Sequence, residues 1–476
     1  MLLTTKHLKK ICVICFFIPI INIPCFAQDY LPFKGIIQVE TNISDGVYSP
    51  LEAINLARKE GIKIVIFTDT FLRRWEYGIW PLQNLIKIKK EQPSIVQYGI
   101  KKYLKKIDEL NRQFPDMVIL SGVEAAPFYW WQGNPFAGKI FNFSWAKHLL
   151  VLGLNARDYE YLPVVSKRYL LPQSFKDLVL VALFISVIFI SGLRLRLRRG
   201  RITLFGYMII LLAIIFLINN FPFPSKYDAY HDDQGYKPYQ GFIDYVQKRG
   251  GFVSWAHPGF RYSRSLGRRV DIISLPYFDV LTNTFDYNAF AGLYGGDVSA
   301  CLANREWDTV LKEFCLNKRK GPVFITAEVD YDGSIPRQKI YGVQTIFLLS
   351  KLDRDAVFEA LRKGRFYARI YEDNFYIDLD EFSIEKKLMG ETAQIENKPK
   401  LIIKGNAFIY PEAEVKLEII RGGEIAQIYE IKQGRFDLEF IDNTLGEAAK
   451  RNYYRLNFFS GEKLILVSNP IFCEVR

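Results

Sequence analysis

The chain has 476 residues, of which 49% are hydrophobic and 15% aromatic, so it can form two or three folded units with large buried cores. Its net charge of +12 would be compatible with a nucleic-acid-binding protein. Three of the basic residues lie at the extreme N-terminus and five lie in one short loop, so two small segments hold most of the excess. We therefore expect no binding to DNA or RNA.

The first 27 residues are typical of an export signal. Three lysines precede an apolar run over residues 11–23, and Cys25-Phe26-Ala27 supplies small residues at the spacing that a signal peptidase needs. We expect cleavage after Ala27, and an uncleaved membrane anchor is the alternative. Residues 22–25 match a lipobox poorly, which makes lipid attachment to Cys25 the weaker interpretation.

Two apolar runs in the middle of the chain predict a membrane hairpin over residues 177–222. Residues 178–193 and 202–225 contain no charged side chain, and "RLRLRRGR" separates them. The second run exceeds the roughly 20 residues that cross a bilayer, whereas the first needs its charged flanks to snorkel. The arginines place the loop in the cytoplasm and both flanking parts on the periplasmic side of the cell membrane. A buried hairpin in a soluble protein is the alternative.

Strand and helix signals alternate on both sides of this hairpin. An apolar strand over residues 35–40 is followed by a capping box, Ser49-Pro50-Leu51-Glu52, by a helix, and by a buried-type strand over residues 62–67. The same alternation recurs further along the chain and predicts a parallel sheet or barrel. We expect residues 33–372 to form one α/β barrel in spite of the inserted hairpin.

Polar residues follow the predicted strands at their C-terminal ends, where barrel enzymes hold their chemistry. Carboxylates and imidazoles gathered there predict either a metal site or a set of strongly shifted pKa values. His148 differs from the others because it opens its strand. The strand-end residues are Glu40, Asp69, Glu124, His257, Glu328 and Asp330.

The pattern changes after residue 375. Short alternating strands separated by Gly and Asn turns predict a C-terminal β-sandwich over residues 375–476, with a packing or spacing role. Three cysteines lie beyond the export signal. Cys301 and Cys315 could form a disulfide or remain as buried free thiols, and Cys473 has no evident partner.

Several short segments resemble the PHP (polymerase and histidinol phosphatase) superfamily. "QVETNISDG" is similar to its His-x-His-Thr-x-x-Ser-Asp-Gly opening, "FTDT" to its Thr-Asp-His, and "SGVEAA" to its Gly-Val-Glu. "KHLLVLG" resembles its His-Leu-Leu segment, "VSWAHPG" its Ala-His-Pro, and "ITAEVDYDG" stands where the family has Asp-x-His. "AVFEALRKGRFYARI" and a β-rich tail ending in "SNPI" resemble the metallo-dependent phosphoesterase branch with a C-terminal sandwich. The resemblance implies a distorted seven-stranded (β/α) barrel, bound metal ions and phosphoester hydrolysis.

The chain departs from the family at several ligand positions. Gln38 and Glu40 replace the paired histidines, Thr70 replaces the histidine after Asp69, and Asp330 replaces the last histidine. Glu328 also stands where the family has Asp. The positions that match the family motifs are Asp45, Asp69, Glu124, His148 and His257.

The resemblance implies catalytic roles for Asp45, Asp69 and His148. A divalent cofactor, Mn, Mg or Zn, follows from the same resemblance, and the loss of imidazoles shifts the preference toward ions that favour oxygen ligands. The metal ligands implied by the family pattern and the strand ends are Glu40, Asp69, Glu124, His257, Glu328 and Asp330.

Two functions remain open at this level. The first is a membrane-anchored, extracytoplasmic, metal-dependent phosphoesterase. The second is an inactive PHP-like barrel that binds a small phosphorylated ligand or a partner in the cell envelope. A transport protein is disfavoured because two apolar helices without charges offer no polar pathway. The substrate and the oligomeric state are not specified by the sequence.

Overall fold

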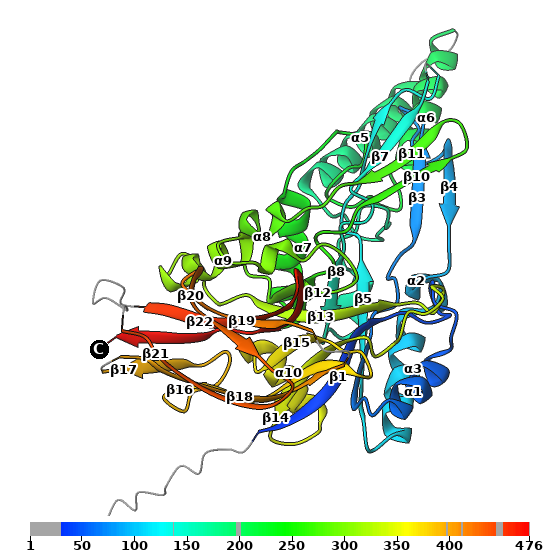
Figure 1. Cartoon of the computed structure of the whole chain (residues 1–476). Coiled ribbons are helices and arrows are strands. Elements are labelled where there is room, and N and C mark those ends of the chain that lie inside the picture. Colours follow the sequence, from blue (N-terminus) through cyan, green and yellow to red (C-terminus); the bar gives the residue numbers. More distant parts are fainter. Residues whose placement is uncertain are drawn as a thin grey trace, which may run out of the picture.

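Seven strands form a closed barrel in the computed structural model, which describes residues 30–136, 138–196, 201–396, 398–410, 413–443 and 451–475 (Figure 1). The predicted export signal lies outside the described residues. Around the barrel the order is β1 (Leu31–Val39), β2 (Ile64–Phe67), β5 (Val118–Ala125), β8 (Leu149–Leu152), β9 (Phe252–Trp255), β12 (Ala289–Leu293) and β13 (Phe324–Tyr331). The barrel closes where β13 pairs with β1.

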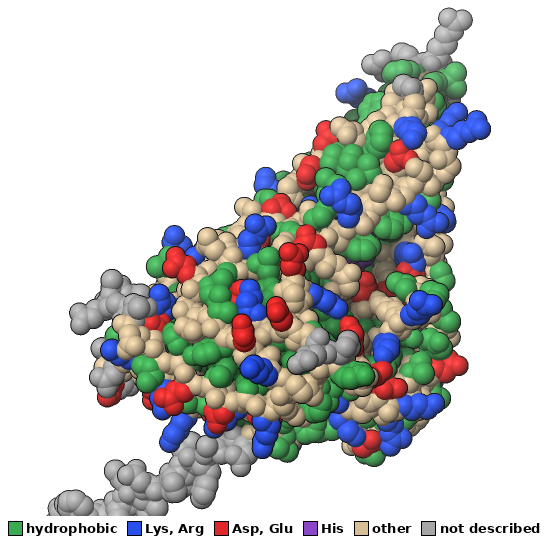
Figure 2. Space-filling view, in the orientation of Figure 1, with side chains coloured by type: hydrophobic (Ala, Val, Ile, Leu, Met, Phe, Trp, Pro, Cys, Tyr) green, Lys and Arg blue, Asp and Glu red, His purple; other side chains and the backbone are tan. Residues whose placement is uncertain are grey.

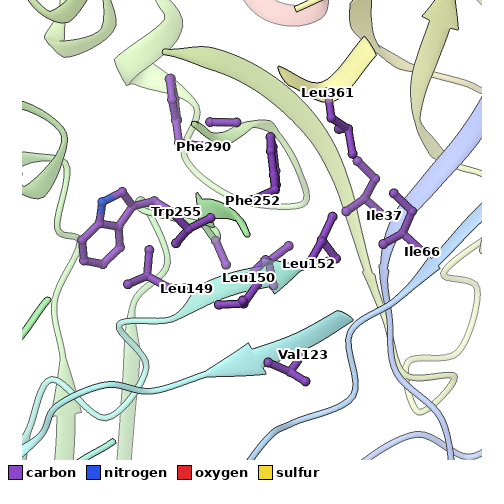
Figure 3. Packing of buried hydrophobic residues seen from close by; sticks show 14 of the residues in the cluster. Ile37, Ile66, Val123, Leu149, Leu150, Leu152, Phe252, Trp255, Phe290 and Leu361 are labelled. Carbon is purple, nitrogen blue, oxygen red and sulfur yellow. The ribbon is translucent and has the colours of Figure 1, made fainter. Parts of the chain in front are cut away.

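The barrel interior is filled by apolar side chains from successive strands. Ile37, Ile66 and Leu150 belong to one buried cluster and gather inside the strands, as Figure 3 shows. Strands buried on both faces read as continuous apolar runs, which is why "IVIF" and "LLVL" lack polar alternation. Packing of this kind gives the strand ends a rigid frame.

The first βαβ unit follows the sequence prediction. α1 (Pro50–Lys59) begins with the expected capping box, in which the Ser49 hydroxyl accepts from the Glu52 backbone N–H and the Glu52 carboxylate accepts from the Ser49 N–H. Each of these side chains thereby satisfies a backbone N–H that the helix itself cannot pair. β1 and β2 then pair in parallel on either side of α1.

The expectation of a regular (β/α) barrel is met only in part. β8 runs antiparallel to both β5 and β9, whereas the other neighbours in the barrel are parallel. The reason is the connection after β5, which runs through β6 (Trp130–Gly133) and β7 (Ile140–Phe143) and contains no helix in its described residues. A strand that returns without a crossover helix re-enters the sheet in the opposite direction.

The other barrel connections carry helices and an arm of short strands. The helices are α2 (Ile95–Tyr98), α3 (Ile100–Gln113), α4 (Ala156–Glu160), α7 (Lys237–Gln247), α8 (Asp279–Asn283), α9 (Glu306–Cys315) and, after β13, α10 (Arg354–Lys363). The arm contains the hairpin of β3 (Arg74–Gly78) and β4 (Lys87–Glu91), and a sheet in the order β10 (Tyr262–Leu266), β11 (Val270–Ser274), β7 and β6.

Two apolar helices project from this arm, away from the later strands (Figure 1). α5 (Phe175–Arg196) contains a span, Phe175–Leu195, with a mean hydropathy of 2.6. None of its apolar window is buried inside the protein, and the span is long and apolar enough to cross a membrane. α6 (Arg201–Asn219) is apolar over Leu204–Asn219. Figure 2 shows patches of hydrophobic side chains on this arm, with Lys and Arg side chains between them.

The relative length of the two helices differs from the sequence prediction. The second apolar run was expected to be the longer span, to residue 225, but α6 ends at Asn219. Pro222 and Pro224 follow within five residues, and proline cannot donate the N–H that would continue the helix. The first helix is longer than expected because Phe175 to Asp177, before the apolar run, already belong to it.

The later strands continue the barrel sheet. β14 (Val343–Leu349) pairs with β1, and the sheet continues through β15 (Phe366–Ile370), β23 (Lys463–Ser468), β22 (Arg451–Ser460), β19 (Val415–Arg421) and β20 (Glu424–Ile431). A second sheet contains β16 (Phe375–Ile384), β18 (Lys400–Ile409) and β21 (Gly434–Ile441), while β17 (Thr392–Ile395) and β24 (Ile471–Val475) extend the first.

These two sheets enclose a second apolar cluster. Ile403 on β18 and Leu417 on β19 are both fully buried and belong to it. Because β14 and β15 belong to the same sheet as β1, the later strands are joined to the barrel by backbone hydrogen bonds as well as by side-chain packing. The domain boundary at residue 375 stays a prediction.

The cysteines in the described residues are free. Cys301 is buried and its thiol donates to the Gly292 carbonyl oxygen at 3.4 Å, and Cys315 and Cys473 are also unpaired. Of the two alternatives left open by the sequence, free thiols are therefore the observed one. Burial raises the pKa of Cys301 to about 12, which keeps this thiol protonated and unreactive at neutral pH.

Candidate metal centre

One end of the barrel brings together donors from three distant segments. Glu124 lies at the end of β5, His148 directly precedes β8, and His257 follows β9. Since β8 runs in the opposite direction, the start of this strand lies at the same barrel end as the finish of its neighbours. One ligand atom of each residue lies within 4.8 Å of the other two, which fits the space around a single cation.

A single carboxylate oxygen is the centre of this cluster. Glu124 Oε1 lies 2.5 Å from His148 Nδ1 and 3.1 Å from His257 Nε2. Gln38 Nε2 also donates to this oxygen at 3.2 Å. Glu124 and His257 are buried and His148 is partly exposed, so the cluster is accessible from one side.

Contacts behind the two histidines orient their rings. His148 Nε2 lies 3.1 Å from the Trp145 carbonyl oxygen, which can only accept, so Nε2 carries a proton and Nδ1 is directed at the cluster. His257 Nδ1 lies 3.4 Å from the Tyr277 hydroxyl, which donates to the Ala256 carbonyl oxygen. Outer contacts of this kind commonly fix metal-binding histidines.

Further oxygen atoms at this end have no hydrogen-bond partner in the described structure. Gln38 Oε1 and Glu328 Oε2 are buried and unpaired. An unsatisfied buried acceptor costs on the order of 1–3 kcal/mol, and a bound cation would remove that cost. Glu40 lies close by, where its Oε1 accepts from the Thr70 hydroxyl at 2.9 Å. The donor set therefore fits a divalent ion.

Unusual backbone conformations aim several of these side chains. Gln38, His257 and Asp330 have φ values of 66°, 28° and 48°, in a region that residues other than glycine rarely adopt. β1 changes register between Ile37 and Val39 against both β2 and β13, which marks a bulge at Gln38. Such bulges redirect a side chain next to a functional site.

Several carboxylates at this end of the barrel have raised pKa values, so their protonated forms are favoured. Burial raises the pKa of Glu328 to about 8, and it also raises the pKa values of Glu40 and Asp330. Glu124 and Asp330 add to the shift of Glu40 by charge repulsion. Protons would therefore neutralise part of the cluster unless a cation takes their place.

The pKa of Glu124 is lowered and that of His257 is raised, and both shifts favour an ion pair between the two residues. Although burial opposes it, the charge of His148 and the contacts of both histidines hold the pKa of Glu124 below its usual range. Burial likewise opposes ionisation of His257, but its hydrogen bond to Glu124 raises the pKa to about 9. Metal binding would require His257 to lose this proton.

Two predicted catalytic residues have other partners. Both Asp69 oxygens accept hydrogen bonds from Thr41, one of them at 2.7 Å from its backbone N–H, and Ser44 donates to Oδ1 at 2.8 Å. Asp69 thus holds the loop after β1 in place. Asp45 forms an ion pair with Arg73 at the edge of this end. Their catalytic roles stay predictions.

Arg73 also lies at this end of the barrel, although none of the predicted motifs contains it. Burial lowers the pKa of its guanidinium, while the negative charges of Glu40 and Glu124 act in the opposite direction, which places Arg73 beside the cluster. The residue lies three positions after Thr70 in "FTDTFLRRW", and this short spacing is the only sequence signal for it.

Two solved structures resemble the chain at low sequence identity. No family model and no curated protein matches the chain. One similar solved structure is a two-domain protein from Bacteroides vulgatus with a predicted PHP-like metal-dependent phosphoesterase, at 11% identity and a TM-score of 0.36, covering 93% of this chain and 95% of that one. Another, assigned as a metal-dependent phosphoesterase from Bifidobacterium adolescentis, has 14% identity and a TM-score of 0.29, covering 69% and 95%. Similarity at this level does not identify a function, which therefore rests on the site itself.

Proposed function

We propose that the chain is a PHP-like, metal-dependent phosphoester hydrolase held at a membrane. The observation that carries the proposal is the convergence of Glu124, His148 and His257 within 4.8 Å at one end of a closed seven-stranded barrel. The buried, unpaired oxygens of Gln38 and Glu328 at the same end support it.

The residues that would hold a divalent ion are Glu124, His148 and His257, with Glu40, Glu328 and Asp330 around them. Mn, Mg and Zn are the ions that suit this mixture of imidazole and carboxylate ligands. When bound, such an ion supplies Lewis-acid polarisation of a phosphoryl oxygen and lowers the pKa of water.

The protein's own groups have separate tasks in this proposal. Thr70 holds Glu40 in position by its hydrogen bond, and the Trp145 carbonyl oxygen holds the ring of His148. Arg73 is a fixed positive charge at the edge of the cluster and would bind the phosphoryl oxygens of a substrate. Asp45 positions Arg73 through their ion pair.

Metal content tests the proposal directly. We expect the purified full chain to retain Mn, Mg or Zn, and a Glu124→Gln, His257→Gln variant to lose it, because both changes remove ligands. A Glu109→Gln, His231→Gln variant is the matched control, since both of these residues are exposed. Mass-spectrometric metal analysis is the measurement, and an unchanged, non-zero content in the first variant would refute the assignment.

Hydrolysis of p-nitrophenyl phosphate tests the chemistry. Arg73→Ala should raise KM more than it lowers kcat if Arg73 binds the phosphoryl group, and Arg73→Lys should recover part of the loss because it keeps the charge without the bidentate geometry. If metal-loaded wild type gives no hydrolysis of any phosphoester tested, the enzymatic proposal is wrong.

An inactive binding barrel is the second candidate. It is favoured by the replacement of the family's histidines at Gln38, Glu40 and Thr70, and by the engagement of Asp69 in the loop after β1. Wild type that retains no metal but still binds a phosphorylated ligand would support this function over hydrolysis.

Attachment to a membrane is proposed from the apolar span Phe175–Leu195 and from the arginines that follow it. The loop between α5 and α6 should be cytoplasmic, with the barrel and the later strands on the periplasmic side. A Gly200→Cys variant should react with a membrane-impermeant maleimide only after the cells are opened. Labelling of intact cells would contradict this orientation.

A further inference from the structure

A cavity of about 740 Å³ lies where the two apolar helices leave the arm. Leu180 of α5 and Asn219 of α6 contribute to its wall, and aromatic rings from the arm, including Tyr129 and Trp131, also line it. The cavity is separate from the metal centre but close to it, because Tyr129 also packs against Trp145, whose carbonyl oxygen contacts His148.

Hydrogen bonds beside the cavity connect the arm to the end of α6. Asn84, in the turn between β3 and β4, donates its backbone N–H to Asn219 Oδ1 at 3.0 Å and its side-chain amide to the Asn219 carbonyl oxygen. The Leu85 backbone N–H donates to the same Oδ1 at 3.3 Å. The cavity therefore lies at the position where the helices would enter a bilayer.

Large apolar side chains around the cavity are exposed. Trp80 is 80% exposed, Phe136 81% and Phe175 81%, and they come from the β3–β4 turn, the β6–β7 turn and the start of α5. Leu170 and Phe221, on the segments next to the two helices, are exposed as well. An exposed group of this kind at the end of a membrane helix is typical of the lipid–water interface, where Trp and other aromatic side chains are enriched.

Three acidic and three basic side chains line the cavity, but the acidic ones all have partners within the protein. Asp228 accepts the backbone N–H of Tyr230, and its other carboxylate oxygen lies 3.2 Å from His231 Nδ1. Glu76 forms ion pairs with Lys87 and Arg168, and Asp177 accepts the backbone N–H groups of residues 173 and 174. Within the described part of the chain, Lys176 and Lys226 line the cavity and make no ion pair, and Arg168 Nε is buried without a hydrogen-bond partner. Phosphate is the group that such donors bind best.

We propose that this cavity binds the phosphate group of an anionic membrane lipid, with the acyl chains alongside the apolar face of α5 near Leu180. The inference rests on the proposed membrane attachment and does not require hydrolysis at the metal centre. The exposed aromatic side chains rest in the bilayer interface, and the two lysines and Arg168 contact the phosphate.

Lipid binding to the full chain in mild detergent is the test. Native mass spectrometry with added dioleoylphosphatidylglycerol or dioleoylphosphatidylcholine should show retention of the anionic lipid at lower concentration. A Lys176→Gln, Lys226→Gln variant should bind phosphatidylglycerol about thirtyfold more weakly, since each lysine near a lipid surface contributes roughly 1 kcal/mol. Lys237→Gln with Lys248→Gln, two exposed lysines of the α7 region, is the matched control and should bind as wild type does.

The outcomes distinguish a lipid headgroup from a soluble phosphate compound as the ligand of the cavity. Equal retention of both lipids, or equal losses in the two lysine variants, would overturn the proposal. Displacement of the lipid by millimolar inorganic phosphate would indicate a site for a soluble phosphate compound and would also overturn it. Metal content and maleimide labelling test the proposed function independently, so failure of the lipid site would be distinguishable from failure of the metal centre.

Discussion

At the scale of single residues, Glu124 organises the candidate metal centre. Its Oε1 contacts the rings of His148 and His257 and the amide of Gln38, so three separate segments converge on one atom. Removing the carboxylate would leave two buried or partly buried rings without their common partner. The contact from Gln38 also shows that the side chain at position 38, where the PHP motif that this segment resembles has histidine, faces the cluster.

Histidines placed where the resembling PHP motif has them should strengthen metal binding. A Gln38→His, Glu40→His, Thr70→His variant would add imidazole ligands and remove one of the carboxylates whose pKa is raised by burial. His also tolerates the positive φ at position 38 better than most residues. We expect the affinity for Zn or Mn to rise by about tenfold or more, measured by calorimetric titration.

The same variant with Glu124→Gln is the control, because it should lose the gain if the new ligands act together with Glu124. A folded triple variant with no gain in affinity would mean that the three side chains do not face a common metal position, and the motif assignment at "QVETNISDG" would then be wrong.

At the scale of elements, Glu76 joins the β3–β4 hairpin to the segment before α5. Its carboxylate lies 2.7 Å from Lys87 Nζ on β4 and 2.5 Å from Arg168 Nη2, and its side chain is 5% exposed. Burial opposes ionisation, but Arg168 and Lys87 lower the pKa of Glu76 below its ordinary value of 4.5. The ionised carboxylate therefore stabilises the arm around the cavity.

Glu76→Gln should lower the free energy of unfolding by about 2 kcal/mol at pH 7, since hydrogen bonds to charged groups are lost. Because the folded-state pKa is depressed, this stabilisation is present above the unfolded pKa and is lost as the pH falls through the folded pKa. The difference between wild type and variant should therefore shrink below about pH 4.5. Denaturant unfolding of the full chain in detergent at several pH values is the measurement, and a difference that is constant with pH would contradict the ionic role. Glu109→Gln, at an exposed position, should have little effect.

At the scale of the whole molecule, a buried ion pair joins the barrel to the later strands. Arg455 on β22 donates from Nη2 to Asp308 Oδ2 on α9 at 2.7 Å and from Nε to Oδ1 at 2.8 Å, and both side chains are fully buried. Tyr453 donates to Asp308 Oδ1 at 2.9 Å. Together with the shared sheet, these bonds connect the two parts of the chain.

Arg455→Met should destabilise the chain by about 3–5 kcal/mol, because it leaves the Asp308 carboxylate buried without its cation. Adding Asp308→Leu should recover much of this loss. Arg435→Met is the matched control, since the Arg435–Asp380 pair is largely exposed and should contribute at most about 1 kcal/mol. Denaturant unfolding in detergent measures all three variants. If Arg455→Met and Arg435→Met unfold alike, the buried pair does not connect the two parts as we infer.

The local sequence determined the features that depend on neighbouring residues. The capping box at Ser49 follows from four consecutive residues, the buried strands follow from their apolar runs, and the long apolar helix follows from composition. Strand ends also predicted that Glu124 and His257 lie close together, because polar residues after an apolar strand lie at the same edge of a barrel.

Only the tertiary structure decided which polar groups meet and in which direction strands run. "FTDT" predicts a site role for Asp69, but only the fold shows that Thr41 and Ser44 donate hydrogen bonds to its oxygens. β8 is antiparallel because the connection after β5 lacks a crossover helix in its described residues, which its own "LLVL" could not reveal. Local patterns specify which face of an element is buried, whereas pairing partners and strand direction depend on segments far apart in the chain, and these are selected only when the whole barrel closes.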